Sequence, residues 1–314
     1  MMGGTLVATG LRKRFGERVA VNDVDFEIAA GEIYGLLGPN GAGKTTAISL
    51  LSGVLPRDAG RVFIDGIDLD AGASARARLG LVPQDVTLYP DLTGRENLRF
   101  WGRMYDLRGL ALDAAVDQAL ESVGLADRAD DLVDTYSGGM QRRLNLAAGV
   151  LHRPSVLILD EPTVGVDPQS RSTLFDLIES YRDAGMAILY TTHYMEEAER
   201  LCSRIGVIDE GRLVAEGACQ DLVSTLGRET RIEIGFSRPG ELERSVSALA
   251  GIPGLVDPGI VDGRLVAFVE DGPALMACVW ARLTKERLMP SSLELRAPNL
   301  EDLFLGLTGR ELRD

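Results

Sequence analysis

Long apolar stretches and cysteine pairs are missing from this chain of 314 residues. No run approaches the ~18 consecutive apolar residues that predict a membrane-spanning helix, and the segment Met1 to Arg14 lacks the basic-then-apolar order of a secretion signal. The three cysteines, Cys202, Cys219 and Cys278, are widely spaced and form no CxxC pair. They indicate neither a disulfide framework nor a zinc site, and such spacing is typical of a reducing compartment. We therefore expect contact with a membrane only through a partner.

Positive charge is also scarce. The chain carries 33 lysines and arginines against 47 acidic residues, a net charge of −14, and has no basic tract, which argues against a nucleic-acid partner. Among those basic residues only Lys13, Lys44 and Lys285 are lysines. Many surface sites accept either basic side chain, but a compact ammonium held between phosphates cannot be replaced by a planar guanidinium. Lys44 is therefore a candidate for a chemical role.

A glycine-rich segment surrounds Lys44 and follows the apolar run Ile33 to Leu37. It fits the phosphate-binding pattern GxxxxGK[ST], in which backbone N–H groups surround phosphate oxygens, the lysine reaches the β and γ phosphates and the next hydroxyl ligates Mg²⁺. A helix starting near Gly43 adds its positive end. The pattern predicts an ATP and Mg²⁺ site formed by nine residues: Gly38, Pro39, Asn40, Gly41, Ala42, Gly43, Lys44, Thr45 and Thr46.

Two carboxylates follow the apolar run Val156 to Leu159, which is typical of a strand buried on both faces of a parallel sheet. At the carboxyl end of such a strand Asp160 can hold Mg²⁺ opposite Thr45, and Glu161 can polarise an attacking water. The other interpretation is an acidic turn without a chemical role.

A second anion-binding segment is Ser137-Gly138-Gly139, which precedes an apolar-patterned helix expected from Arg142 to Leu151. Alone it could be a helix cap and nothing more. One nucleotide needs only one such helix start from its own subunit. If both starts contact the same triphosphate, they must come from different chains.

These motifs, in this order, resemble the ATP-binding subunit of an ABC transporter, over about residues 5–220. The resemblance implies these roles: adenine stacking by Phe15, Walker A at 38–46, the Q-loop residue Gln84 as a metal or water ligand, the signature motif at 137–141, Walker B ending at Asp160, the catalytic residue Glu161, the D-loop residue Asp167 and the switch residue His193.

Taken singly, several of these residues have plainer interpretations. Phe15 is as readily a core aromatic as a stacking platform, and Gln84 alone would be a loop glutamine, although its neutral carbonyl can ligate metal or water. His193 follows the apolar run Ile188 to Thr192 and can hydrogen-bond a γ-phosphate. His152, the other histidine, is interpreted as a helix C-terminal residue without a catalytic part.

Departures from the usual family pattern point to one subgroup of the family. Tyr136 stands where leucine is usual, Met140 stands where glutamine is frequent, and the segment 164–167 has no leading serine. Phrases around these positions, with the tail segments 300–304 and 307–310, resemble daunorubicin-resistance-type bacterial exporter ATPases. That subgroup implies export of a drug, lipid or ion.

The pattern of apolar residues predicts an α/β fold with two domains. Residues 1–225 are expected to form an ABC-type P-loop ATPase domain with a RecA-like core, an antiparallel β subdomain beginning with Leu6 to Ile28, and a helical subdomain at about 88–155 that opens with a capping box at Thr93 to Glu96. The helix after this box is expected to carry Leu98, Trp101, Met104 and Tyr105 on one face. Residues 226–314 are expected to form a small α+β domain of ferredoxin-like type, with strands at 231–236, 264–269 and 293–296 and helices at 241–249 and 273–288. The last helix, 299–307, places its leucines on one stripe that packs within the domain or forms a dimer contact.

The resemblance implies that two copies, or one copy and a homologue, close around two Mg·ATP and drive a separate membrane permease at the cytoplasmic face of a bacterial cell membrane. The alternative is a soluble ABC-type ATPase acting on nucleic acid or the ribosome. Between Lys44 and Ser137 no sustained heptad appears, and no second phosphate loop is found. A nonhydrolytic sensor is disfavoured because Glu161 and His193 are both present. Cargo and transport direction are not identified by these residues.

Overall fold

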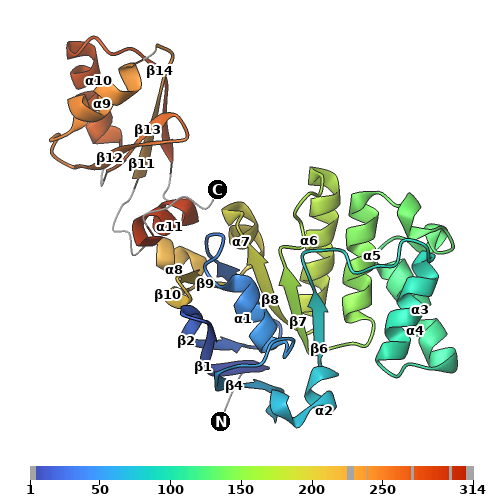
Figure 1. Ribbon diagram of the computed structural model, residues 1–314. Helices are drawn as coiled ribbons and strands as arrows, with labels where there is room; N and C mark the ends of the chain where they lie inside the picture. Colours follow the sequence, from blue (N-terminus) through green and yellow to red (C-terminus); the bar gives the residue numbers. More distant parts are fainter. Residues whose placement is uncertain (1–4, 225–229, 239, 270–271, 297–298, 309–314) are drawn as a thin grey trace. The chain divides into compact units, whose positions relative to one another are not determined.

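The computed structural model describes residues 5–224, 230–238, 240–269, 272–296 and 299–308, which form two compact units (Figure 1). The first unit extends to Cys219, and the second begins at Gln220. The change of domain expected at about residue 225 lies outside the described residues. Within the described ranges, no helix has both the length and the apolar character needed to cross a bilayer.

A six-stranded sheet forms the centre of the first unit (Figure 1). Its strands, in spatial order, are β10 (Arg212–Gly217), β9 (Arg204–Asp209), β3 (Ile33–Leu37), β8 (Ala187–Thr192), β7 (Val156–Asp160) and β6 (Leu79–Val82). Neighbouring strands are parallel except β9 and β10. Strands β3, β7 and β8 are buried along their whole length, which confirms the prediction of strands covered on both faces. Their carboxyl ends lie at one edge of the sheet.

A second sheet confirms the antiparallel sheet predicted for the N-terminal segment. It contains β2 (Arg18–Ile28), β1 (Leu6–Phe15), β4 (Ala59–Ile64) and β5 (Ile67–Asp68), in that order. Helix α1 (Lys44–Leu51) contacts β1 and β2 of this sheet and β7 of the central sheet. Its buried residues Ala47, Ile48 and Leu50 share one apolar core with both sheets. The helix that follows the glycine-rich loop is therefore held from two sides.

The helical region expected at about 88–155 contains α3 (Gly94–Met104), α4 (Gly109–Ser122) and α5 (Gly138–Val150), which pack on one apolar core. The predicted capping box is confirmed: Thr93 Oγ1 accepts from the Glu96 N–H, and Glu96 Oε2 accepts from the Thr93 N–H. Met104 was expected on the buried face with Leu98 but is 66% exposed. Met104 follows Leu98 by six residues, so the two side chains point about 120° apart around the helix axis.

Other helices complete the first unit. They are α2 (Ala73–Arg76), α6 (Pro168–Asp183) and α7 (Met195–Leu201), and 3-10 turns occupy Leu69–Ala71, Ala126–Arg128 and Val133–Thr135. The short α8 (Cys219–Ser224) begins at the last residue of the first unit, and its other residues belong to the second. Helix α6 follows β7 after residues 161–167, and α7 follows β8 after residues 193–194. Both helices therefore start at the same edge of the sheet.

The second unit has the β-α-β-β-α-β order of a ferredoxin-like domain. Its elements are β11 (Thr230–Phe236), α9 (Glu241–Leu249), β12 (Leu255–Val261), β13 (Arg264–Val269), α10 (Gly272–Lys285) and β14 (Pro290–Arg296), with sheet order β12-β13-β11-β14. Sequence reasoning missed β12. Pro258 and Gly259 interrupt its alternation, and its pairing with β13 shifts register between Val256 and Gly259.

Helix α11 (Leu300–Thr308) belongs to the second unit. Leu300, Leu303 and Phe304 are buried, whereas Leu307 is 44% exposed. Buried Arg231 of β11 donates a hydrogen bond to buried Asp302 of α11. Most of the predicted stripe therefore packs within the chain. The tail phrase at 309–310 lies outside the described residues.

The capping box predicts a measurable loss of stability. Thr93→Ala removes the hydroxyl that accepts from Glu96 N–H, and we expect the free energy of unfolding of the helical region to fall by about 1 kcal/mol. Urea unfolding followed by Trp101 fluorescence in a Trp280→Phe background measures this loss, because Trp101 lies in α3. Thr93→Ser keeps the acceptor and is the matched control. Equal midpoints for the two variants would contradict the prediction.

Candidate functional site

Two glycines of the phosphate-loop segment have no room for a side chain. A Cβ at Gly38 would lie 2.4 Å from the backbone oxygen of Ile208, and a Cβ at Gly43 would lie 2.5 Å from that of Ala20. Gly43 also has φ 111° and directly precedes α1, a conformation that L-residues rarely adopt. The loop can therefore lie against β2 and β9 only with glycine at both positions.

Lys44 begins α1 and its side chain is only 6% exposed. Its Nζ donates to Gly38 O at 2.6 Å and lies 3.7 Å from Glu161 Oε1. Burial lowers the pKa of the Lys44 ammonium, while the nearby carboxylates of Glu161 and Asp160 raise it. The Lys44 ammonium is thus held between the carbonyl oxygen of Gly38 and the carboxylate of Glu161.

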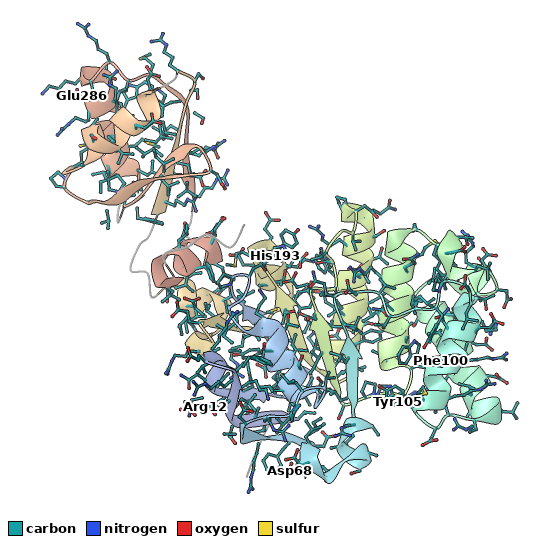
Figure 2. The ribbon with its side chains drawn as sticks, in the orientation of Figure 1. Arg12, Asp68, Phe100, Tyr105, His193 and Glu286 are labelled. Carbon is teal, nitrogen blue, oxygen red and sulfur yellow. The ribbon has the colours of Figure 1, made fainter. Side chains whose placement is uncertain are left out.

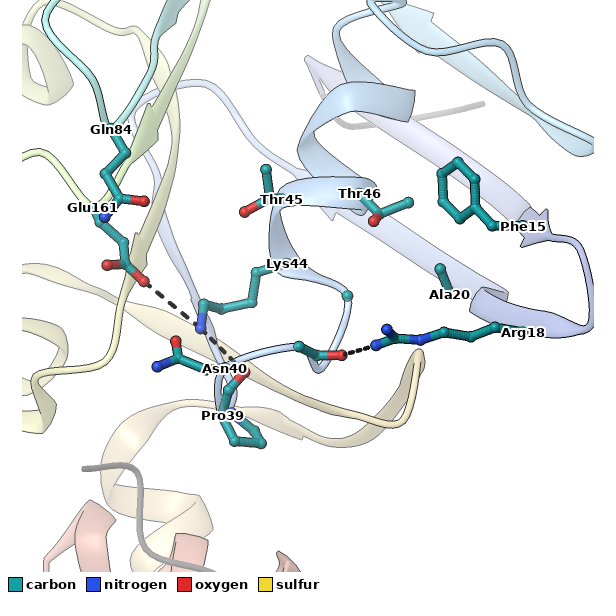
Figure 3. Close-up of a pocket in the computed structure, with 12 residues that line it drawn as sticks. Phe15, Arg18, Ala20, Pro39, Asn40, Lys44, Thr45, Thr46, Gln84 and Glu161 are labelled. Atoms are coloured by element: carbon teal, nitrogen blue, oxygen red, sulfur yellow. Dashed lines mark hydrogen bonds and ion pairs between the residues drawn. The ribbon is translucent and has the colours of Figure 1, made fainter. Parts of the chain in front are cut away.

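A pocket of about 470 Å³ opens beside this lysine (Figure 3). Its lining consists of Phe15, Arg18, Ala20, Pro39, Asn40, Gly41, Gly43, Lys44, Thr45, Thr46, Gln84 and Glu161. Phe15 is 49% exposed and faces the pocket in Figure 3, so the core-aromatic interpretation is wrong. Gly38 and Ala42 do not line this pocket. The other predicted loop residues do.

Sequence reasoning missed two arginines near the pocket. Arg18, on β2, donates to Gly41 O at 2.9 Å and lines the pocket. Arg142, on α5, donates to Gln84 O and, at 3.1 Å, to Val164 O. It joins the Gln84 loop to the segment after Glu161. Neither arginine belongs to a recognisable pattern, because each acts through carbonyl groups of distant segments.

The two carboxylates at the end of β7 differ in surroundings. Asp160 accepts from Thr191 Oγ1 at 2.7 Å, and burial raises the pKa of its carboxyl group, opposed by hydrogen bonds from Thr191 and Thr45. Glu161 has φ 45°, a left-handed conformation rare outside glycine. Its N–H lies 3.0 Å from Thr191 Oγ1 and 3.2 Å from Thr191 O. Thr191 of β8 thus holds both residues.

His193 follows β8 directly, at the sheet edge where the sequence places it (Figure 2). Its Nδ1 lies 3.1 Å from Glu161 Oε2. His152 has a different environment: its Nε2 lies 3.1 Å from Leu79 O, its ring stacks on Tyr105, and burial lowers its pKa. Of the two histidines, His193 is the one in contact with the Glu161 carboxylate.

The remaining predicted residues lie outside the pocket lining. Ser137 caps α5 by accepting from Met140 N–H at 3.3 Å, so the helix begins at Gly138 and not at Arg142. Asp167 caps α6 by accepting from the N–H groups of Gln169 and Ser170. Ser137, Gly138 and Asp167 are exposed, whereas Gly139 is buried. The structure does not bring this group to the pocket of its own chain.

Tyr136 explains one departure in the signature segment. Its ring is buried in the helical core, and its hydroxyl donates to Arg128 O at 2.6 Å. A Cβ at Gly139 would lie 2.3 Å from Ser170 Oγ. The starts of α5 and α6 therefore meet at Gly139, and Ser137, Gly138 and Asp167 are exposed close to this contact.

Comparison with known proteins assigns the family. A family model described as ABC transporter matches residues 21–164. The linearmycin resistance ATP-binding protein LnrL of Bacillus subtilis is 42% identical over 98% of this chain and 100% of its own length. The chain belongs to the ABC transporter ATP-binding subunits. It is an ATPase with the ABC-type P-loop fold, and the range matched by the family model includes the loop around Lys44.

Further relatives and solved structures agree with this ABC assignment. The Nod factor export ATP-binding protein I of Burkholderia lata is 44% identical over 97% of each chain, and the daunorubicin resistance ATP-binding protein DrrA3 of Streptomyces coeruleorubidus is 39% identical over 100% of this chain and 98% of its own. A solved ATP-binding subunit of an ABC transporter is 28% identical, with a TM-score of 0.65 over 71% of this chain and 93% of its own. The daunorubicin-type resemblance and the ABC ATPase fold are both confirmed.

The raised pKa of Asp160 predicts a stability change. Because the folded state binds the proton more tightly than the unfolded state, the charged carboxylate lowers stability above the folded pKa, and this cost disappears as pH falls from the folded pKa to the ordinary carboxyl value of 3.8. We expect Asp160→Asn to melt a few degrees higher than the wild type near pH 8 without nucleotide, with a smaller difference near pH 4. Scanning calorimetry measures both, with exposed Asp127→Asn as the control. A lower melting temperature at both pH values would contradict it.

Proposed function

We propose that this ABC ATPase binds Mg·ATP in the pocket beside Lys44 and powers export of a drug, lipid or ion through a separate membrane permease at the cytoplasmic face of a bacterial membrane. One observation carries the proposal: Lys44, Gln84 and Glu161 line one pocket, and His193 lies 3.1 Å from Glu161. The relatives' names, with antibiotic resistance and Nod factor export, support export. They do not favour a nucleic-acid or ribosome partner.

The phosphate loop provides the binding energy for the triphosphate. In this proposal residues 38–46 cradle the phosphates with backbone N–H groups, and the positive end of α1 adds to the attraction. Lys44 leaves the Gly38 carbonyl for the β and γ phosphates. Phe15 offers its exposed face to the adenine, and Arg18 lies at the same mouth of the pocket.

The oxygen donors near Lys44 fit Mg²⁺. The described residues contain no cluster of three or more acidic, histidine or cysteine side chains suited to a metal, and a nucleotide-bound Mg²⁺ needs only one or two protein carboxylates besides phosphate and water. Asp160 is buried with a raised pKa and accepts from Thr45, so a cation there would compensate its charge. Thr45, Asp160 and Gln84 would hold Mg²⁺, which neutralises charge on the phosphates.

Glu161 and His193 are proposed to perform the hydrolytic step. The Glu161 carboxylate lies between the Lys44 ammonium, at 3.7 Å, and His193 Nδ1, at 3.1 Å. Once Lys44 binds phosphate, Glu161 is available to orient and polarise the attacking water. His193, at the carboxyl end of β8, is placed to hydrogen-bond the γ-phosphate and to hold the Glu161 carboxylate.

The second half of each site is proposed to come from another chain. Ser137, Gly138, Gly139 and Asp167 stand apart from the pocket, and most of them are exposed. A homodimer, or a dimer with a homologue, would place this surface against the phosphates of the opposite subunit. The permease is proposed to dock beside Gln84 and the helical region, where Tyr89 is exposed.

Each unit is proposed to have a distinct task. Residues 1–225 act as the nucleotide-binding domain, and residues 226–314 as an accessory domain that stabilises the dimer or tunes its opening. The second unit supports this division because its apolar core is its own and is formed by residues from Ile232 to Leu288.

Removal of the Glu161 charge should stop turnover and keep ATP bound. We expect Glu161→Gln to lower the rate of ATP hydrolysis by at least about a hundredfold and to accumulate an ATP-bound dimer, seen by size-exclusion chromatography with light scattering. Glu121→Gln removes an exposed charge and is the matched control. Turnover at the wild-type rate in Glu161→Gln would remove Glu161 from the mechanism.

Ser137 should be needed for the ATP-dependent dimer but not for the binding of ATP to a single chain. Ser137→Asp keeps a good helix cap but places a carboxylate where the opposite triphosphate is expected. In the Glu161→Gln background we expect it to abolish the ATP-dependent dimer while the affinity of a fluorescent ATP analogue changes by less than about twofold. Ser137→Thr, which keeps the hydroxyl, should retain the dimer. A persistent dimer in Ser137→Asp would disprove the shared site.

A further inference from the structure

A buried carboxylate lies behind the Glu161 and His193 pair. Glu197, in the first turn of α7, is 3% exposed. Its Oε1 accepts from Thr163 Oγ1 at 2.7 Å, and its Oε2 accepts from Tyr190 OH at 2.9 Å and from Thr192 Oγ1 at 2.8 Å. Buried carboxylates are costly unless their lone pairs are satisfied. Three hydroxyl donors on other segments satisfy this one.

The donors belong to the two segments that carry the proposed hydrolytic residues. Thr163 lies two positions after Glu161, and Thr192 directly precedes His193. The Thr192 hydroxyl also accepts from the N–H of Tyr194 at 2.9 Å. Glu197 therefore holds the backbone on both sides of His193 through a single hydroxyl, and it holds the chain after Glu161 through another.

Strand β8 divides its side chains between two carboxylates. Successive residues of a strand point to opposite faces, and the Thr191 hydroxyl donates to Asp160 whereas the Thr192 hydroxyl donates to Glu197. The end of β8 is thus fixed from both faces of the sheet. A shift of this strand end would move His193 away from Glu161.

A third segment also reaches Glu197. Arg171 Nε, in the first turns of α6, lies 3.6 Å from Glu197 Oε1, and the Arg171 guanidinium lies 5.3 Å from the centre of the Tyr194 ring. Helix α6 begins at the Asp167 cap. The Glu197 carboxylate therefore contacts the segment after β7, strand β8 and helix α6, which starts at the proposed dimer surface.

We propose that Glu197 is a positioning residue for ATP hydrolysis: it holds the backbone of His193 and the segment 163–167 in fixed relation, so that His193 Nδ1 stays against the Glu161 carboxylate. This inference rests on the hydrolytic roles proposed for Glu161 and His193. Glu197 itself does not line the pocket. Its effect should appear in the chemical step and not in nucleotide affinity.

The first test compares two glutamines on one helix in the full-length chain. Glu197→Gln keeps the size of the side chain but turns one acceptor oxygen into a donor, which conflicts with the hydroxyls. We expect kcat for ATP to fall at least about tenfold while KM changes by less than about twofold. Exposed Glu196→Gln, with the same loss of charge, is the control and should match the wild type. Equal kcat values for the two variants would overturn the proposal.

A second measurement asks whether Glu197 acts through His193. If it does, Glu197→Gln added to His193→Ala should lower kcat no further than about twofold, because the positioned group is already gone. Independent, multiplying losses would overturn the proposal. A His193→Ala variant at the wild-type rate would remove His193 from the mechanism, and the inference with it. A slow His193→Ala variant beside a fast Glu197→Gln variant would discard the inference alone.

Thr163→Val covers the case in which Glu197→Gln does not fold. It removes one of the three hydroxyl donors with little change of shape. We expect an intermediate loss of kcat with KM for ATP close to that of the wild type, and a melting temperature a few degrees lower because the buried carboxylate loses one donor. A wild-type kcat in a folded Thr163→Val variant would count against the role of Glu197, whether or not Glu197→Gln can be purified.

Discussion

The balance of charge around Lys44 is the constraint on which the site depends. Its ammonium is almost fully buried, with the Glu161 carboxylate 3.7 Å away and Asp160 nearby. An isolated buried charge would be too costly to maintain, so the ends of β3 and β7 must face each other across the pocket. The parallel order β3-β8-β7 meets that requirement. Asp160, whose pKa is raised by burial, is a second carboxylate near the single ammonium.

This ABC subunit holds its phosphate loop rigidly, whereas the helix caps at Ser137 and Asp167 lie at an exposed surface. Gly38 and Gly43 press the phosphate loop against neighbouring backbone, and α1 shares its core with two sheets. By contrast Ser137 and Asp167 cap helices at an exposed surface. A preorganised loop and an exposed second surface are compatible with the shared nucleotide site that we propose for two subunits.

Much of the fold could be predicted from local pattern. The runs that became β7 and β8 are continuously apolar because both faces are covered, and the Thr93 capping box is a contact between residues close in sequence. Prediction failed where the position of a residue depended on an exact angle, a strand register or a backbone contact that the apolar pattern does not specify. Met104 lies outside the apolar face because of its angle around the helix, and β12 is interrupted by a register shift at Gly259. Arg142 acts on carbonyl groups, which no side-chain pattern reveals.

The sequence by itself determined the phosphate loop of this ABC ATPase, because nine consecutive residues and their glycines define that geometry locally. It also determined that Asp160, Glu161 and His193 follow buried strands. Only the tertiary structure decided that Glu161 lies between Lys44 and His193, since residues so far apart in the chain meet through the order of parallel strands. The same holds for Glu197, whose donors come from segments that only the folded sheet brings together.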